Sequence, residues 1–444
     1  MLTKLHYNIF FAVLLSYGFI AVMIPNRVFC MMTVNFVVAF ITQMALLIYF
    51  SREEAVCYSG KTLFWTVFIY SIFLGTLFML ISYYYDDDTF LFCKLDAMFY
   101  YKNSMKAAEM GLAKGILWLC QTFKYDDWGA LVMDCIVLYI IPSKLFLNAI
   151  FLLLGAVSSV FLFRMAQHYM PDAYAFLAAL GYGTSSFMVF FHCSFLKESA
   201  FVFFVIATLY YQHLYITNQS RSSLIAVVFF VIIQLFFRPA VSAMLLASIF
   251  AYYGITQRRN AISLFLYIAA AGVFVAALKD IQEILDSNTQ GGDVEALVAE
   301  TNNSSYSYSF NYFVSLFGAV FGPFPAAFPK NPEAPTWVEF YGAGLSHRMF
   351  LVFSFWSGVY MVFKNRVLEM IPLVLFVLFE LLVTGLVCAS LELRKVILHI
   401  PFMYLLSFYG LSFKFKESQS SQLMTFAKYA FIIGIFFLWN VIRV

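Results

Sequence analysis

Charged side chains at the breaks between long apolar stretches are the residues of this chain that could do chemistry. The first group is Asp86-Asp87-Asp88, which directly follows three tyrosines at 83–85. Adjacent carboxylates raise one another's proton affinity, so one of the three is suited to act as a general base that accepts a hydroxyl proton. The alternatives are a solvated acidic loop and a divalent-cation site.

Cations occupy the next breaks. Lys197 and Glu198 separate two apolar stretches, and Arg238 stands before Pro239 between two others. A lysine at a helix N-terminus faces the positive end of the helix dipole and is favoured there only when an anion is near, and a bound phosphate would supply one. The planar fork of Arg238 also suits phosphate. The structural alternatives are a Lys–Glu or Lys–Asp pair that closes the helical bundle, and an arginine that reaches lipid headgroups.

The remaining candidates lie nearer the C-terminus. Arg348, Arg394, Lys395 and His399 extend the set of predicted phosphate-binding or substrate-binding residues. Glu380 differs because it lies in the middle of an apolar stretch, where a carboxyl group is costly. We expect it to belong either to an ion pathway or to a buried pair.

The composition decides where these groups lie. The chain has 444 residues, of which 63% are hydrophobic, with 27 Lys plus Arg and 24 Asp plus Glu. Water-soluble domains carry about 25% charged residues, so lipid must be the solvent, and we predict an all-α integral membrane protein with one domain over 1–444. The small net charge of +3 contains no basic run and argues against nucleic-acid binding. The scattered cysteines and histidines predict no metal site, and we expect no cofactor.

Apolar windows between polar breaks predict about thirteen membrane-spanning helices. They cover 8–24, 29–50, 63–84, 145–163, 174–192, 199–217, 222–237, 240–256, 261–278, 348–363, 368–388, 398–413 and 424–441. An N-terminus in the cytoplasm places most Lys and Arg residues of the short connections on the inner side, as the positive-inside rule requires.

Two longer segments, 85–144 and 279–347, then lie on the outer side. The first contains two apolar pieces, 111–123 and 129–141, which are too short to span a bilayer and are predicted to be interfacial or re-entrant helices. With this topology, the acidic and cationic candidates gather on one outer face of the bundle.

Several short motifs resemble those of bacterial surface-polysaccharide membrane enzymes. They are Asp86-Asp87-Asp88-Thr89-Phe90, Tyr182-Gly183, Ser194-Phe195-Leu196-Lys197-Glu198-Ser199, Phe237-Arg238-Pro239, Gly322-Pro323-Phe324-Pro325 and Arg394-Lys395 to Pro401. The chain is similar in these places to C-type glycosyltransferases, which use polyprenyl-phosphate sugars, and to Wzy-type repeat-unit polymerases. The resemblance implies that an acidic residue of the first outer loop is the base, here Asp86, Asp87 or Asp88. In this chain that loop follows the third predicted span rather than the first.

We therefore expect an enzyme of the bacterial inner membrane that transfers a sugar or oligosaccharide from a polyprenyl-(pyro)phosphate carrier to an acceptor hydroxyl on the periplasmic face. Its partners would be a lipid-linked donor, a glycan or lipid-linked acceptor, membrane lipid and other polysaccharide-assembly proteins. Lys197, Arg238 and Arg394 would neutralise the departing phosphate. The alternative is a flippase for lipid-linked oligosaccharide, although the charges crowd toward one face and no internal repeat is visible. A non-catalytic scaffold is a third reading.

Overall fold

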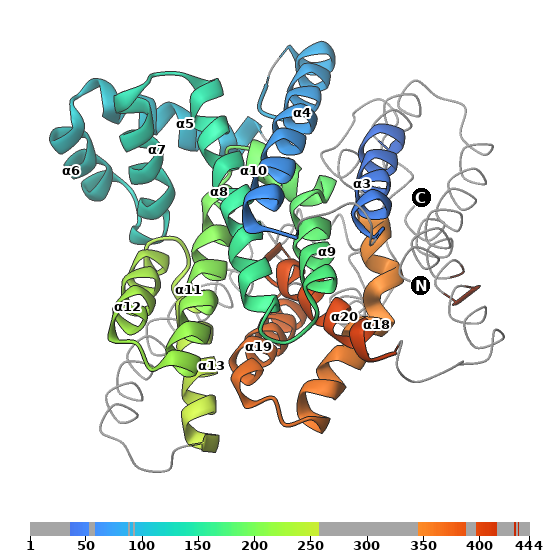
Figure 1. The fold of residues 1–444 in the computed structure, drawn as a ribbon. Coiled ribbons are helices and arrows are strands. Elements are labelled where there is room, and N and C mark those ends of the chain that lie inside the picture. The colour runs from blue at the N-terminus through green and yellow to red at the C-terminus, as the bar shows by residue number, and fades with distance from the viewer. Residues whose placement is uncertain are drawn as a thin grey trace, which may run out of the picture.

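The computed structural model describes residues 36–52, 58–87, 89–91, 94–256, 345–387 and 397–414, with residues 430, 431 and 434 near the C-terminus. Within these ranges every regular element is a helix (Figure 1), as the sequence predicts. The first half contains η1 (Phe36–Ile41), α3 (Thr42–Phe50), α4 (Gly60–Asp86), α5 (Lys94–Glu109), α6 (Leu112–Thr122), η2 (Tyr125–Asp127), α7 (Trp128–Ile140) and α8 (Lys144–Ala166). The rest contains α9 (Asp172–Gly183), α10 (Ser186–Cys193), α11 (Glu198–Asn218), α12 (Arg221–Leu235), α13 (Pro239–Thr256), α18 (Leu345–Lys364), η4 (Leu368–Met370), α19 (Ile371–Val387) and α20 (Ile400–Lys414).

Three described helices are long and apolar enough to cross a membrane, at Gly60–Tyr84, Lys144–Ala166 and Ala200–Asn218. The first two begin at serine N-caps, where Ser59 accepts a hydrogen bond from the N–H of Thr62 and Ser143 accepts one from the N–H of Phe146. Shorter apolar helices occupy Arg221–Leu235, Pro239–Phe250, Leu351–Lys364 and Ile400–Phe413. Apolar helices of spanning length characterise a membrane protein. The expected spans at 8–24 and 261–278, and nearly all of 424–441, lie outside the described residues.

α4 has one face that packs against other helices and one apolar face that is exposed. Leu74 and Phe78 are fully buried against the other helices, whereas Ile69, Phe73 and Leu80 are more than half exposed. An apolar face that stays exposed along a spanning helix is stable only in contact with lipid or another apolar surface. The charged residues Lys61 and Asp87 lie at the two ends of this helix.

The stretch predicted as a single span at 174–192 is a broken helix. α9 and α10 are bent by 48° at the break between Gly183 and Ser186. Thr184 turns its hydroxyl back to the Leu180 carbonyl, 2.7 Å away, and Gly183 has no room for a Cβ because Val67 and the Ser159 hydroxyl approach it closely. All eight residues of α10 are buried, so the broken pair lies in the interior of the bundle.

Helices α5, α6 and α7 form a group at one side of the bundle, at the upper left in Figure 1. Two of them, Leu112–Thr122 and Trp128–Ile140, coincide with the apolar pieces that the sequence marked as short helices. The third, α5, was not predicted because its sequence mixes apolar and charged residues throughout. The 3-10 turn η2, between α6 and α7, lies beside the N-terminus of α11.

Two glycines allow α18 and α20 to approach each other closely. A Cβ on Gly358 would lie 1.9 Å from the carbonyl oxygen of Leu406, and one on Gly410 would lie 2.3 Å from the carbonyl oxygen of Ser354. Both obstacles are backbone atoms, so a side chain is accommodated only if the helices move apart. Small residues at such crossings are typical of helix packing in membranes.

Replacing Gly358 by alanine should therefore destabilise the protein by about 1–3 kcal/mol, since the added methyl overpacks a backbone contact. Thermal unfolding of the full chain in detergent, followed by intrinsic fluorescence, measures this loss. The matched control is Gly434→Ala, because a Cβ at Gly434 meets nothing within 4 Å. Equal melting temperatures for the two variants would contradict the close α18–α20 contact.

Candidate functional site

Lys197 is paired with a carboxylate that lies far away in the sequence. Its Nζ atom lies 3.0 Å from Oδ1 of Asp127 in η2, and both side chains are partly exposed. The hydroxyl of Tyr100 in α5 donates to the same Oδ1 atom over 2.7 Å. Asp127 is the anion that makes a lysine favourable immediately before the N-terminus of α11.

Glu198 follows in the first turn of α11 and makes the second ion pair. Its Oε1 atom accepts from Nη2 of Arg238 over 2.6 Å. The Glu198 side chain is only 2% exposed, whereas the Arg238 side chain is 28% exposed. The guanidinium also lies 5.8 Å from the ring centroid of Phe201, one turn along α11. A carboxylate so deeply buried requires its cation, because an unpaired buried charge is strongly unfavourable.

Backbone contacts hold these two ion pairs together. The N–H of Gly129, at the start of α7, donates to the carbonyl of Phe236 over 2.8 Å. A Cβ on Gly129 would lie 2.3 Å from the Phe237 ring, so only glycine lets this ring pack against α7. The contact fixes the turn that carries Arg238 beside the η2 turn that carries Asp127.

Tyr100 shows that the two pairs share one electrostatic environment. Burial raises the pKa of the Tyr100 phenol, and the negative charges of Asp127, Glu198 and Asp96 raise this pKa further. The hydroxyl therefore stays protonated and donates to Asp127. We call Tyr100, Asp127, Lys197, Glu198 and Arg238 the charge cluster.

Of the three consecutive aspartates, only Asp87 has a described side chain, and it makes no described contact with the charge cluster. Asp87 caps α4 in a left-handed conformation, with φ 51°, and is exposed. The side chain of Asp86 and all of Asp88 lie outside the described residues. Phe90, three residues after Asp87, has its ring centroid 5.8 Å from that of Phe195, which precedes Lys197 by two residues. The end of α4 and the start of α11 therefore lie at the same end of the bundle.

The structure separates His399 from the charge cluster. Its Nδ1 atom hydrogen-bonds to Oε2 of Glu380, and both side chains are buried. Glu380 is thus partnered, which is one of the two arrangements that its sequence position allowed. Arg348 belongs to α18, but its side chain lies outside the described part of the chain, as do Arg394 and Lys395.

Two members of the charge cluster, Asp127 and Tyr100, were not candidates on sequence grounds. Asp127 belongs to a polar break, Lys124-Tyr125-Asp126-Asp127, between two short apolar pieces, and this break was available as a signal. Tyr100 carries no comparable signal, because the chain has 29 tyrosines and the partner lies 27 positions away.

Comparisons with known proteins found no family model that matches the chain and no curated protein that matches its sequence. Within the described ranges, no three His, Cys, Asp or Glu residues lie close enough together to hold a metal ion.

The geometry suits the binding of an anion. The bond to Glu198 uses one of the five N–H donors of Arg238, and the bond to Asp127 uses one of the three donors of Lys197. Both cations are partly exposed, and the carboxylates hold them in fixed positions. A phosphate that reaches this end of the bundle would meet two cations that are already ordered, which reduces the entropy cost of binding.

A double-mutant cycle should reveal coupling in the buried ion pair. Arg238→Met leaves the Glu198 carboxylate buried without its cation and should cost about 3 kcal/mol of unfolding free energy. Glu198→Gln should cost less, and the double variant should lose clearly less than the sum, with a coupling energy of about 1–3 kcal/mol. Chemical unfolding of the purified protein in detergent measures all three. Additive losses would contradict a direct interaction.

Proposed function

We propose that the chain is a membrane enzyme that transfers a sugar or oligosaccharide from a polyprenyl phosphate or pyrophosphate carrier to an acceptor hydroxyl. The observation that supports this most is the convergence of Lys197 and Arg238 in one charge cluster at the end of the spanning helices. The two cations come from different helix junctions, and the fold brings both junctions to the same end of the bundle. The enzyme would be either a C-type glycosyltransferase or a Wzy-type repeat-unit polymerase.

The substrate chemistry fits the surroundings of the charge cluster. A lipid-linked sugar has a hydrocarbon tail, a phosphate and an anomeric carbon. Exposed apolar residues at this end of the bundle, Leu80 and Tyr83 on α4 and Ile140 and Leu145 around the start of α8, would contact the tail. Lys197 and Arg238 would hold the phosphate and stabilise the charge that develops as it leaves.

The general base would be one of Asp86, Asp87 and Asp88. Asp87 is exposed at the end of α4, so an acceptor hydroxyl can reach it from water. Asp127 is less suitable because Lys197 and Tyr100 already bind its Oδ1 atom. We assign Asp127 and Glu198 to positioning the two cations.

The proposed setting is the bacterial inner membrane, with about thirteen spans and a cytoplasmic N-terminus. In this orientation the charge cluster and Asp87 face the periplasm, where lipid-linked sugars are consumed. The long segment 279–347 would cover the site from the outer side and select the acceptor.

A flippase for the same class of lipid is the second candidate, and the buried Glu380–His399 pair favours it. Ionisable residues inside a membrane domain often belong to ion-coupled transport. The two functions differ in one assay, because a flippase leaves a lipid-linked donor chemically unchanged in detergent.

Binding of undecaprenyl phosphate should depend on the two cations. Saturating ligand should raise the melting temperature of the purified protein. Lys197→Met and Arg238→Met should each weaken this binding about tenfold or more, the equivalent of one charge-assisted hydrogen bond. Each shift is compared with the same variant without ligand, which separates binding from stability. Lys61→Met, at the opposite end of α4, is the control and should bind as the wild type does. Equal binding by all variants would refute the phosphate site.

The base is tested by turnover of lipid-linked sugar donors in detergent. Asp86→Asn, Asp87→Asn and Asp88→Asn should include at least one variant that transfers sugar about 100-fold more slowly, the usual contribution of a general base. That variant should still bind undecaprenyl phosphate normally, because the carboxylate does not contact the phosphate. Full turnover by all three variants would exclude the aspartates as the base.

A further inference from the structure

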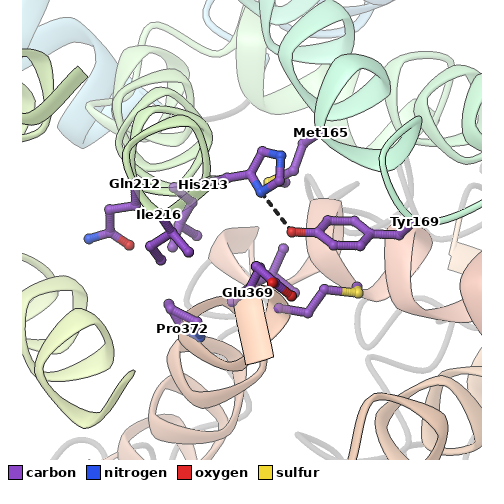
Figure 2. Close-up of a pocket in the computed structure, with 10 residues that line it drawn as sticks. Met165, Tyr169, Gln212, His213, Ile216, Glu369 and Pro372 are labelled. Atoms are coloured by element: carbon purple, nitrogen blue, oxygen red, sulfur yellow. Dashed lines mark hydrogen bonds between the residues drawn. The ribbon is translucent and has the colours of Figure 1, made fainter. Parts of the chain in front are cut away.

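A second polar site lies at the other end of the bundle. A small pocket is formed where the C-terminal half of α11 meets the α8–α9 connection, η4 and the start of α19. Most of its lining is apolar, and its polar groups include Tyr169, His213 and Glu369. Figure 2 shows the Tyr169 hydroxyl between the imidazole of His213 and the carboxylate of Glu369.

One short hydrogen bond organises this pocket. The Tyr169 hydroxyl lies 2.6 Å from Nδ1 of His213. His213 is only 3% exposed, and its Nε2 atom has no hydrogen-bond partner among the described residues. Glu369, in contrast, is exposed to solvent. The three side chains therefore form a path between water and a buried imidazole.

The groups around the pocket favour a neutral phenol. Burial raises the pKa of Tyr169, and the negative charge of Glu369 raises it further, with smaller effects from Tyr252 of α13 and Tyr409 of α20. On the same side of the pocket, the ring of His168 lies 4.6 Å from that of His213, at an angle of 73°. The phenol keeps its proton, so it can donate one hydrogen bond while accepting another.

We propose that Glu369, Tyr169 and His213 form a proton-binding site that takes up one proton from the aqueous face at this end of the bundle. The inference is independent of the proposed glycosyl transfer, because these residues lie far from the charge cluster. His213 follows Glu198 by fifteen positions on α11, which corresponds to about 22 Å along the helix axis.

The proton transfer balances without any further reactant. A hydronium ion at the aqueous face gives its proton to the exposed Glu369 and becomes water. The acid then gives its proton to the Tyr169 oxygen, directly or through a water molecule in the pocket, while the phenol gives its own proton to Nδ1 of His213. The phenol is regenerated, and the products are an imidazolium and a carboxylate. Glu369 is then the counter-ion of a charge that would otherwise be very costly inside a spanning helix.

Protonation would also change how the helices pack. In the neutral state the phenol donates to His213. In the protonated state Nδ1 of His213 donates to the phenol oxygen, and the phenol hydroxyl turns toward Glu369. The protonated state therefore connects η4 to α11 through Tyr169 of the α8–α9 connection.

Nuclear magnetic resonance of the full chain in lipid nanodiscs, with [13Cε1]histidine, tests the site. The chain has six histidines, and His213→Gln identifies the signal of interest. Between pH 3 and pH 8 this signal should titrate, and Glu369→Gln should lower the titration midpoint by about one pH unit, because the counter-ion is lost. Asp172→Asn is the matched control. Asp172 is a carboxylate near the pocket that accepts from Gln167 over 2.9 Å and does not line the pocket, and its replacement should leave the midpoint unchanged.

Tyr169→Phe separates a proton relay from a merely structural hydrogen bond. Removing one oxygen should slow the exchange of the His213 proton with water, so the single averaged signal should broaden or split near its midpoint. The proposal is overturned if His213 does not titrate in this range, if Glu369→Gln moves the midpoint no more than Asp172→Asn does, or if Tyr169→Phe leaves the line shape unchanged.

Discussion

The arrangement at one end of this bundle depends on the buried carboxylate of Glu198. A charge that is 2% exposed at the end of an apolar helix is tolerated only with a cation in contact, and Arg238 provides it. This requirement fixes the turn between α12 and α13 against the start of α11. Lys197, the preceding residue, needs an anion because it faces the positive end of the α11 dipole, and Asp127 brings the α5–α7 group to the same place. The two pairs thus assemble three parts of the chain around one charge cluster.

The chemistry that this cluster can do follows from its charge and exposure. Each cation is held by a carboxylate on one side and remains partly exposed on the other, so an anion can bind without first ordering the side chains. The nearby end of α4 places Asp87 at the same end of the bundle. At the opposite end, Tyr169 and His213 form a separate polar site, and α8 and α11 connect the two. Among the described residues, the interior between them is mainly apolar and contains scattered buried polar side chains, which include the Glu380–His399 pair.

The features that depend on local sequence could be predicted. The apolar stretches predicted the helices, and the breaks between them marked Lys197, Glu198 and Arg238 as unusual.

The sequence left phosphate binding and a Lys–Asp pair as alternatives for Lys197, and the structure shows the pair with Asp127. That partner was missed because it lies 70 positions away, and no local pattern encodes such a pairing. The sequence groups His399 with the phosphate-binding residues, but its Nδ1 atom hydrogen-bonds to Glu380 inside the bundle, where a buried carboxyl group needs a partner. The sequence does not predict the break at Thr184, because an apolar window measures hydrophobicity and not the direction of the helix axis.

The central claim is that the aspartates at the end of α4 and the charge cluster face the same side of the membrane. The most direct measurement is the labelling of single cysteines, introduced at Asp87, Lys197 or Lys61 in a chain without native cysteines, by a membrane-impermeant thiol reagent in sealed vesicles of known orientation. α4 is long enough to separate Lys61 from Asp87 by about 40 Å, more than the hydrocarbon thickness. The account predicts that cysteines at 87 and 197 react from one side and that the cysteine at 61 reacts only from the other. Labelling of positions 87 and 197 from opposite sides would contradict it.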